Sequence, residues 1–163
     1  MSPRAASRLE SLGFKEVYDY KAGKADWFAF DLPRAGRTAS EPRLADVVHR
    51  DAPACRLEDP IRTARKLLAE TGWDWCAVMN EERVLLGRLR ASELPPDDSS
   101  AAEKVMEAGP STYRPDVPLS EMLEKMREGA FDLVFVTDPD GRFIGTARRS
   151  EIEAAVAQPS RTR

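Results

Sequence analysis

The sequence contains the same stretch twice. From residue 54 to residue 94, each position can be compared with the position 58 residues further on without opening a gap, as Gly87 can with Gly145. Gap-free agreement of this length indicates an internal duplication, so both copies should fold alike. Further identical pairs at this offset are Arg56 and Arg114, Pro60 and Pro118, Glu70 and Glu128, Asp74 and Asp132, Val78 and Val136, Arg90 and Arg148, Ser92 and Ser150, and Glu93 and Glu151.

Each copy predicts the order strand, helix, strand, strand, helix, preceded by a short helix. The long helix opens at a proline, which suits a first helical turn because its missing N–H has no partner there. Asp59 is a candidate N-cap in the first copy. The strand after this helix is apolar on both faces, as expected of a buried strand. The predicted ranges are short helices at 44–48 and 102–106, short strands at 54–57 and 111–114, and buried strands at 73–79 and 131–137.

A tight turn connects the buried strand to the next strand in each copy. In residues 138–141 proline fixes one dihedral and glycine accepts a positive φ, which predicts a turn. Phe143 and Ile144 are typical strand residues, and Gly145 lets another group approach the backbone closely. Residues 80–94 have the same layout. A helix is expected after each of these strands, so the predicted fold is α/β (α+β) with two β-α-β-β-α repeats.

Composition and charge narrow the functional classes. The chain has 163 residues and a formal net charge of -3, from 25 Lys and Arg against 28 Asp and Glu. This near balance gives no general attraction to nucleic acid. No apolar run is long enough to span a bilayer, so no membrane contact is expected. The N-terminus lacks the apolar segment of a signal peptide, so the expected location is cytoplasmic.

The cysteines and the histidine indicate neither a catalytic site nor a metal site. Cys55 and Cys76 lie in apolar, strand-like runs without CxxC spacing, so buried free thiols are expected. A disulfide is the weaker alternative in the cytoplasm. His49 is the only histidine, and no cysteine cluster surrounds it in the sequence, so a zinc site is not expected. Because no catalytic constellation is present, the chain is predicted not to be an enzyme.

The residues before the duplication predict a separate small segment. Residues 2–12 predict a helix with Ser2 as N-cap and Gly13 as terminator. A short strand at 17–20 and a short helical piece after Gly23 follow. This segment resembles the second half of a rhodanese-like domain, a family in which a catalytic cysteine loop precedes the first helix; no cysteine stands there in this sequence. The residues that carry the resemblance are Ser2-Pro3-Arg4-Ala5-Ala6, Leu12-Gly13-Phe14, Val17-Tyr18, Gly23, Trp27 and Leu32-Pro33.

The duplicated region resembles a tandem pair of CBS domains. The resemblance implies two repeats that pack sheet to sheet, and a homodimer formed through the CBS pairs. The family pattern is matched best in the second copy, by Val105-Met106, Thr112, Pro115-Asp116-Val117-Pro118-Leu119, Met126, Val136-Thr137-Asp138, Asp140-Gly141-Arg142 and Ile144-Gly145. The implied division is a rhodanese-like fragment at 1–38, a linker at 39–43, repeats at 44–95 and 101–157, a linker at 96–100 and a tail at 158–163.

In the CBS family, the clefts between repeats commonly bind adenosyl ligands such as AMP, ATP or S-adenosylmethionine. The contacts come from the turn between strand and helix, which has the pattern Gly, two apolar residues, Thr or Ser, two variable residues, then Asp or Asn. Here Arg90 and Arg148 replace Thr or Ser, and Glu93 and Glu151 replace Asp. A carboxylate can accept ribose hydroxyls, and a guanidinium can bind phosphate with two hydrogen bonds.

These turns supply the candidate ligand-binding residues. Because arginine cannot cap a helix, Ser92 and Ser150 are expected to cap the helices that follow. An alternative role for the arginines is a surface ion pair, such as Arg90 with Glu93. The aromatic residues of the buried strands are expected to fill the core rather than to stack on a base. The candidates are Gly87, Arg88, Arg90, Glu93, Arg56, Gly145, Arg148, Glu151 and Arg114.

The leading hypothesis is a non-enzymatic regulatory module that binds an adenine nucleotide or a related anionic adenosyl ligand, with no cofactor and no metal. Two alternatives stay open. One is a rhodanese-type sulfurtransferase whose catalytic half is missing and whose CBS domains are regulatory. The other is a CBS scaffold that dimerises without a ligand. Ligand titration separates the first hypothesis from the last, and a catalytic cysteine loop would identify the sulfurtransferase.

Overall fold

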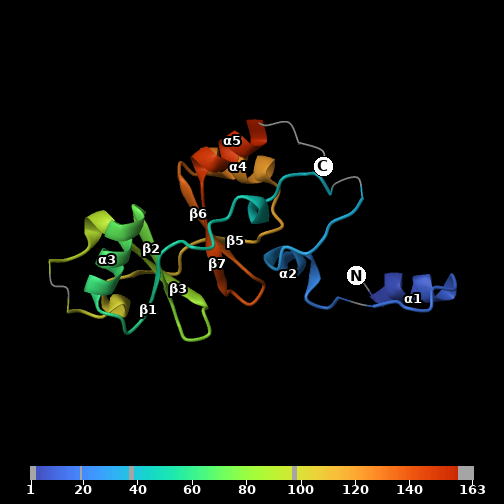
Figure 1. Ribbon diagram of the computed structural model, residues 1–163, viewed down its shortest axis with the longest axis horizontal. Helices are drawn as coiled ribbons and strands as arrows, with labels where there is room; N and C mark the ends of the chain where they lie inside the picture. Colours follow the sequence, from blue (N-terminus) through green and yellow to red (C-terminus); the bar gives the residue numbers. More distant parts are fainter. Residues whose placement is uncertain (1–2, 19, 37–38, 97–98, 158–163) are drawn as a thin grey trace.

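The computed structural model describes residues 3–18, 20–36, 39–96 and 99–157 of the chain. In this part of the chain the strands form two sheets (Figure 1). The first sheet has the order β1-β2-β3-β4, with β1 Ala54–Arg56, β2 Trp75–Met79, β3 Leu85–Arg90 and β4 Glu107–Ala108. The second sheet has the order β5-β6-β7, with β5 Thr112–Tyr113, β6 Leu133–Thr137 and β7 Phe143–Arg148.

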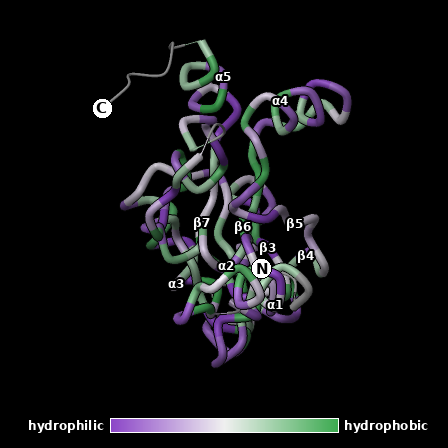
Figure 2. Tube along the Cα trace, turned by 90° about the vertical axis from the view of Figure 1, so that its right-hand side faces the viewer, coloured by the Kyte–Doolittle hydropathy of each residue, from purple (hydrophilic) through white to green (hydrophobic). Residues whose placement is uncertain are grey.

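The helices are divided between the sheets. α3 packs on the first sheet, whereas α4 and α5 lie together at one end of the molecule beside the second (Figure 1 and Figure 2). No helix of the described residues is both long and apolar enough to cross a membrane. The helices are α1 Pro3–Ser11, α2 Gly23–Ala29, α3 Ile61–Thr71, α4 Leu119–Glu128 and α5 Arg149–Ala157, with 3₁₀ turns at Leu44–Asp46, Ala91–Glu93 and Ala102–Lys104.

The two sheets repeat one topology, which confirms the α/β fold predicted from the duplication. β1 pairs with β2 in parallel, as β5 does with β6, and the pairs β2–β3 and β6–β7 are antiparallel. The antiparallel pairs share a shift in register, after Val78 in the first copy and after Val136 in the second. Val84 and Arg142, which are equivalent residues, pair with each other in an antiparallel bridge. The two copies are therefore related by an approximate two-fold axis.

Each copy places its leading segment on the sheet of the other copy. We call these segments, residues 43–49 and 101–107, the exchanged segments. As a result Leu44 is buried in the core of the second copy, and Ala102 is buried in the core of the first. The equivalent contacts are Leu44 N–H to Val117 O at 3.0 Å, Ala102 N–H to Asp59 O at 2.9 Å, His49 paired with Thr146 of β7, and Glu107 of β4 paired with Arg88 of β3.

Two recurring glycines are explained by this exchange. A Cβ on Gly145 would lie 2.1 Å from the backbone oxygen of His49. A Cβ on Gly87 would lie 2.3 Å from Sδ of Met106. Both distances are shorter than any real contact. At Gly145 the close atom is backbone, so the exchanged segment can reach β7 only where the side chain is a hydrogen atom. At Gly87 the close atom belongs to the flexible side chain of Met106. The close approach predicted at Gly145 is confirmed.

The two copies differ after their third strands, where the sequence predicts a helix in each. α5 follows β7, but only the 3₁₀ turn Ala91–Glu93 follows β3, so that prediction is wrong for the first copy. Pro95 and Pro96 provide the reason, because proline lacks an N–H and disfavours helical backbone in the residue before it. The short strand β4 was also not predicted, since its two residues carry no periodic signal.

The starts of α3 and α4 correct two smaller expectations. Pro60 and Pro118 occupy the N-cap positions, one residue before the first helical turn. Asp59 is therefore not the N-cap of α3. Its carboxylate instead accepts the backbone N–H of Arg56 at 2.8 Å and closes the turn between β1 and α3.

The N-terminal segment lies beside the second copy. α1 forms as predicted, ends at Gly13 with φ of 93°, and lies away from both sheets (Figure 1). α2 is tied to the chain that follows by Arg50, whose Nη2 donates to Ala29 O at 2.9 Å. The described residues of the predicted strand 17–20 make no strand pairing, so that strand is not found. The Ser2 cap and the 158–163 tail lie outside the described residues.

Candidate functional site

A pocket of about 970 Å³ lies between the two copies. Its lining contains equivalent residues from both copies, so the approximate two-fold axis passes through it. We call it the axial pocket. Its equivalent pairs are Trp73 and Phe131, Asp74 and Asp132, Trp75 and Leu133, Arg90 and Arg148, and Ser92 and Ser150, and it is completed by Arg88, Glu93, Glu107, Ala130, Arg149 and Glu153.

Strand pairing brings these side chains together. Trp75 at the start of β2 is paired with Arg90 at the end of β3, and Leu133 of β6 is paired in the same way with Arg148 of β7. Directly opposed residues in an antiparallel pair point to the same face of a sheet. Each sheet therefore presents one arginine beside one apolar side chain at the edge of the pocket, and the turns that follow β3 and β7 add charged residues.

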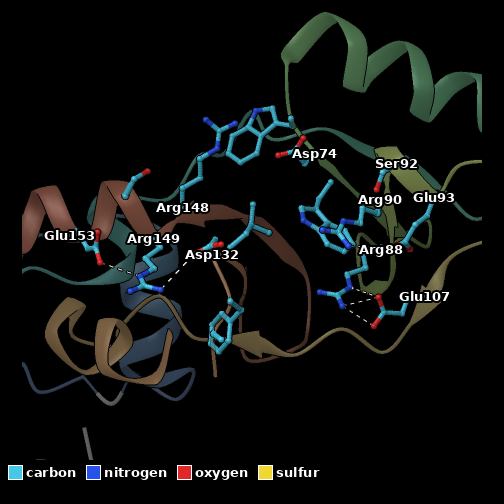
Figure 3. Close-up of a pocket in the computed structure, with 16 residues that line it drawn as sticks. Asp74, Arg88, Arg90, Ser92, Glu93, Glu107, Asp132, Arg148, Arg149 and Glu153 are labelled. Carbon is cyan, nitrogen blue, oxygen red and sulfur yellow. Dashed lines mark hydrogen bonds and ion pairs between the residues drawn. The ribbon is translucent and has the colours of Figure 1, made fainter. Parts of the chain in front are cut away.

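On its side of the pocket the first copy places two arginines close to one aromatic ring. The guanidinium carbons of Arg88 and Arg90 lie 4.4 and 5.1 Å from the ring centre of Trp75. Arg88 also donates two hydrogen bonds of 2.8 Å to Glu107 (Figure 3). Arg90 makes a longer ion pair of 3.3 Å with Glu93. Both arginines of this side therefore already have carboxylate partners.

The second copy differs in how its arginines are engaged. Arg149 contacts Glu153 at 3.1 Å and Asp132 at 3.7 Å. The guanidinium of Arg148 instead lies over Trp73, with its carbon 3.9 Å from the ring centre. Within the described ranges no carboxylate lies at ion-pair distance from Arg148, and no dashed line reaches it in Figure 3. Arg148 is thus held by an aromatic face and open to an anion.

The turn after β7 is fixed by Glu151. One carboxylate oxygen, Oε2, accepts the backbone N–H of Arg148 at 3.1 Å, and Oε1 lies 2.7 Å from Nε2 of His49. This is one half of a capping box, in which the residue three positions into the helix bonds back to the cap position. The capping role expected of Ser150 therefore belongs to Glu151. Ser92 provides no cap either, because the turn after β3 has no side-chain cap.

The structure brings together four of the nine predicted ligand-binding residues. Arg88, Arg90, Glu93 and Arg148 line the axial pocket. The other five do not line it. They are Gly87 and Gly145 beneath the exchanged segments, Glu151 against His49, Arg56 exposed on β1, and Arg114, whose Nη1 donates to Thr137 Oγ1 at 2.5 Å and to Asp138 O.

Several lining residues were not among the predicted ones. Asp74 and Asp132 recur at the duplication offset, which was a signal that sequence reasoning could have used. Trp73 is buried as expected of a core residue, with 8% of its surface exposed, yet its face also borders the pocket. Glu107 and Glu153 have no recurring counterpart of the same type, so only the fold identifies them.

The cysteines lie away from the pocket. Cys55 and Cys76 are buried and free, as predicted. Hydrogen bonding to Cys55, together with burial, raises the pKa of the Cys76 thiol. A thiol with a raised pKa is a poor nucleophile, because the thiolate is the reactive form. No group of three or more His, Cys, Asp or Glu residues that could hold a metal ion occurs in the described part of the chain.

Part of the chain matches a known protein family. The CBS domain family matches residues 102–158, the second copy. No curated protein matches the chain. No support is found for the resemblance of residues 1–38 to a rhodanese-like domain.

Several solved structures, two of them named as CBS domains, have a similar fold. The cytosolic domain of the Mg²⁺ channel MgtE in complex with ATP is 18% identical with a TM-score of 0.64, over 71% of this chain and 49% of that one. The CBS domains of a Streptococcus pneumoniae transcriptional regulator are 14% identical with a TM-score of 0.64, over 69% and 98%. The CBS domain pair of protein MJ0100 with 5′-methylthioadenosine and S-adenosyl-L-methionine is 18% identical with a TM-score of 0.61, over 71% and 100%.

The chain thus spans about half the length of the magnesium-channel domain that it matches, and all of the MJ0100 domain pair. At these identities the likeness concerns the fold.

Proposed function

We propose that this chain is a regulatory module that binds an anionic, adenine-containing small molecule in the axial pocket. The observation that carries the proposal is Arg148, an arginine that faces the pocket without a carboxylate partner among the described residues. A guanidinium in this position binds phosphate or carboxylate with two parallel hydrogen bonds. Arg148 is therefore the expected anchor of the ligand's anionic group.

Another arginine of the pocket can also bind the ligand at a small cost in free energy. The pocket is lined by four arginines and by five carboxylates, those of Asp74, Glu93, Glu107, Asp132 and Glu153. Arg90 and Glu93 are about half exposed and more than half exposed, and exposed pairs of this kind contribute about 0–1 kcal/mol. A phosphate can therefore replace Glu93 as the partner of Arg90. The released carboxylate of Glu93 is then available for ribose hydroxyls.

The size and the aromatic content of the pocket favour a nucleotide. Ligand pockets commonly measure about 300–1,000 Å³, and the axial pocket is at the upper end of this range. Trp75 is partly exposed, and a planar base can replace one of the two guanidinium groups that lie over its ring. Support also comes from two solved structures of similar fold, one named with ATP and the other, a CBS domain pair, with 5′-methylthioadenosine and S-adenosyl-L-methionine.

Calorimetric titration with AMP, ADP, ATP, S-adenosylmethionine and NAD, with adenosine as the uncharged reference, tests the proposal. Arg148→Gln should weaken the binding of ATP roughly ten- to a hundredfold, because a hydrogen bond to a charged group contributes about 1.5–3 kcal/mol. The same substitution should change adenosine binding little, and added salt should weaken ATP binding. A ligand present at a hundred times its dissociation constant should also stabilise the fold by about 2.7 kcal/mol in a thermal-shift assay.

A matched control is Arg142→Gln. Arg142 pairs with Asp140 in the turn between β6 and β7 and does not line the pocket, so its loss should leave ATP binding unchanged. Equal losses from both substitutions, or equal losses for ATP and adenosine, would contradict an anchoring role for Arg148. If the intact protein binds no adenine compound, the alternative of a scaffold without a ligand is favoured.

A further inference from the structure

Four side chains from three separate parts of the chain meet beside the axial pocket. They are His49 of an exchanged segment, Trp73 before β2, Arg148 at the end of β7 and Glu151 in α5. Nε2 of His49 lies 2.7 Å from Oε1 of Glu151. The ring of His49 meets the ring of Trp73 at an angle of 72° with 5.3 Å between centres, and Arg148 lies over the same indole. Trp73 is therefore contacted by both His49 and Arg148.

The backbone fixes His49 in this place. Its N–H donates to Thr146 O at 2.7 Å, and its carbonyl oxygen accepts the N–H of Thr146 at 3.2 Å. His49 is thus hydrogen-bonded to β7 two residues before Arg148. The two oxygens of Glu151 are then divided between the imidazole of His49 and the backbone N–H of Arg148. Neither oxygen is directed to the guanidinium of Arg148.

The equivalent positions of the first copy have a different arrangement. Glu107 occupies the place of His49, and Glu93 occupies the place of Glu151. Two carboxylates do not form a hydrogen bond with each other when both are ionised. Each therefore takes an arginine instead, Glu107 taking Arg88 and Glu93 taking Arg90. In the first copy the glutamate of the turn thus engages the arginine of the turn.

We propose that His49 is a positioning residue of the axial pocket, which keeps Arg148 available to a ligand by occupying Glu151. Without the imidazole, Glu151 is free to pair with Arg148, as Glu93 pairs with Arg90 in the first copy. The guanidinium would then leave Trp73 and lose its orientation toward the pocket. This inference rests on the proposed function for its effect on ligand binding, but the arrangement of His49, Glu151 and Arg148 can be tested without any ligand.

The test measures ATP binding by calorimetry for three variants. His49→Ala should weaken binding about tenfold, approaching Arg148→Gln, because the guanidinium is diverted to Glu151. Adding Glu151→Gln to His49→Ala should restore binding to within about threefold of the original protein, since the neutral amide does not hold the guanidinium. His49→Gln should bind almost as well as the original protein, because its side-chain amide can still donate to Glu151.

Asp51→Asn is the matched control. Its carboxylate lies 3.8 Å from the other ring nitrogen of His49 and is largely exposed, so its change should leave binding unaffected. A structural role of His49 alone would weaken binding in His49→Ala without recovery in the double variant, and that result would overturn the proposal. Undiminished ATP binding in His49→Ala would overturn it as well.

A readout without ligand separates this proposal from the proposed function. The guanidinium Nε–H signal of Arg148 in ¹⁵N–¹H NMR spectra, assigned with Arg148→Lys, reports on its partner. In His49→Ala this signal should move toward that of an ion-paired arginine, and in the double variant it should return. An unchanged signal in His49→Ala overturns the positioning role, whether or not ATP binds. Failure of the original protein to bind ATP, with the signal shifting as expected, overturns only the proposed function.

Discussion

The two copies have equivalent strands, but different elements cover their hydrophobic cores. In the second copy α5 covers α4, with Ile152 and Leu123 buried between them. In the first copy the chain after β3 makes a single 3₁₀ turn, and Arg65, the counterpart of Leu123, donates from Nη2 to the carbonyl oxygen of Pro95 at 2.7 Å. One copy is thus closed by an apolar helix pair and the other by a polar contact.

The same difference extends to the axial pocket. Where the first copy has Trp75 and Arg88, the second has Leu133 and Thr146. The pocket therefore has an aromatic, ion-paired side and a side on which Arg148 is open.

The largest effect is expected at the helix that only one copy has. Ile152→Ala should destabilise the protein by about 4 kcal/mol, because the side chain is fully buried and its loss leaves a cavity. Its counterpart Leu94 is only partly buried, so Leu94→Ala should cost about 1 kcal/mol. The midpoints of urea unfolding measure both values. Equal losses would mean that the two copies are closed equally well after all.

The next effect separates the two recurring glycines. Gly145→Ala should destabilise the protein by about 3 kcal/mol, because its Cβ would meet backbone atoms of His49, which cannot move without breaking the pairing with β7. Gly87→Ala should cost about 1 kcal/mol, since Met106 is a flexible side chain that can turn away. Denaturant unfolding of both variants checks the difference. A larger loss at Gly87 would contradict this view of the contacts.

A smaller effect compares the two arginines of the turns. Arg90→Gln should weaken ATP binding by only about threefold, because Arg90 must first leave Glu93 and contributes the difference between two ion pairs. Arg148→Gln should cost at least tenfold, since Arg148 gives up no carboxylate. Calorimetry under one salt concentration compares them. A reversed order would move the anchor of the ligand to the first copy.

The smallest effect is expected from removing residues 1–38. The N-terminal segment is joined to the chain that follows by partly exposed contacts, such as Arg34 with Asp46 at 2.6 Å, Arg50 with Ala29, and Arg43 over the ring of Phe28. Contacts of this kind contribute about 0–1 kcal/mol each. A chain that starts at Ala39 should therefore melt within roughly 4 °C of the full chain. Loss of the cooperative melt would show that the segment belongs to the core of the second copy.

Most of the fold could be predicted from the duplication, because agreement between two copies identifies strands and glycines that a single copy would leave ambiguous. The exchange of the leading segments could not be predicted, since the offset between the copies is the same whichever sheet a segment covers. The short final element of the first copy could have been predicted from Pro95 and Pro96. The contact of Glu151 with His49 could not be predicted, because the two residues are 102 positions apart and no local pattern connects them.

The candidate site was predictable to the extent that it repeats. Arg90 and Arg148 recur and line the pocket, as does Glu93. Arg56 at the end of β1 and Arg114 directly after β5 recur as well, but they do not line the pocket, and Arg114 is bound to the end of β6. Recurrence therefore selects residues that the fold requires along with those that line the pocket, and only the geometry separates the two groups.

The exchanged segments also determine the order in which the protein can be completed during its synthesis. The first sheet has all of its strands once β4 has been made. Residues 43–49 emerge before any strand, yet the sheet that they cover is finished only with β7. The contact between Arg43 and Asp116 spans 73 residues, and closing so long a loop is costly in chain entropy and slows folding. On the ribosome, the strands of the first sheet can therefore pair early, although Phe135 and Phe143 join its core only later. The second core must wait for two segments made far apart in time.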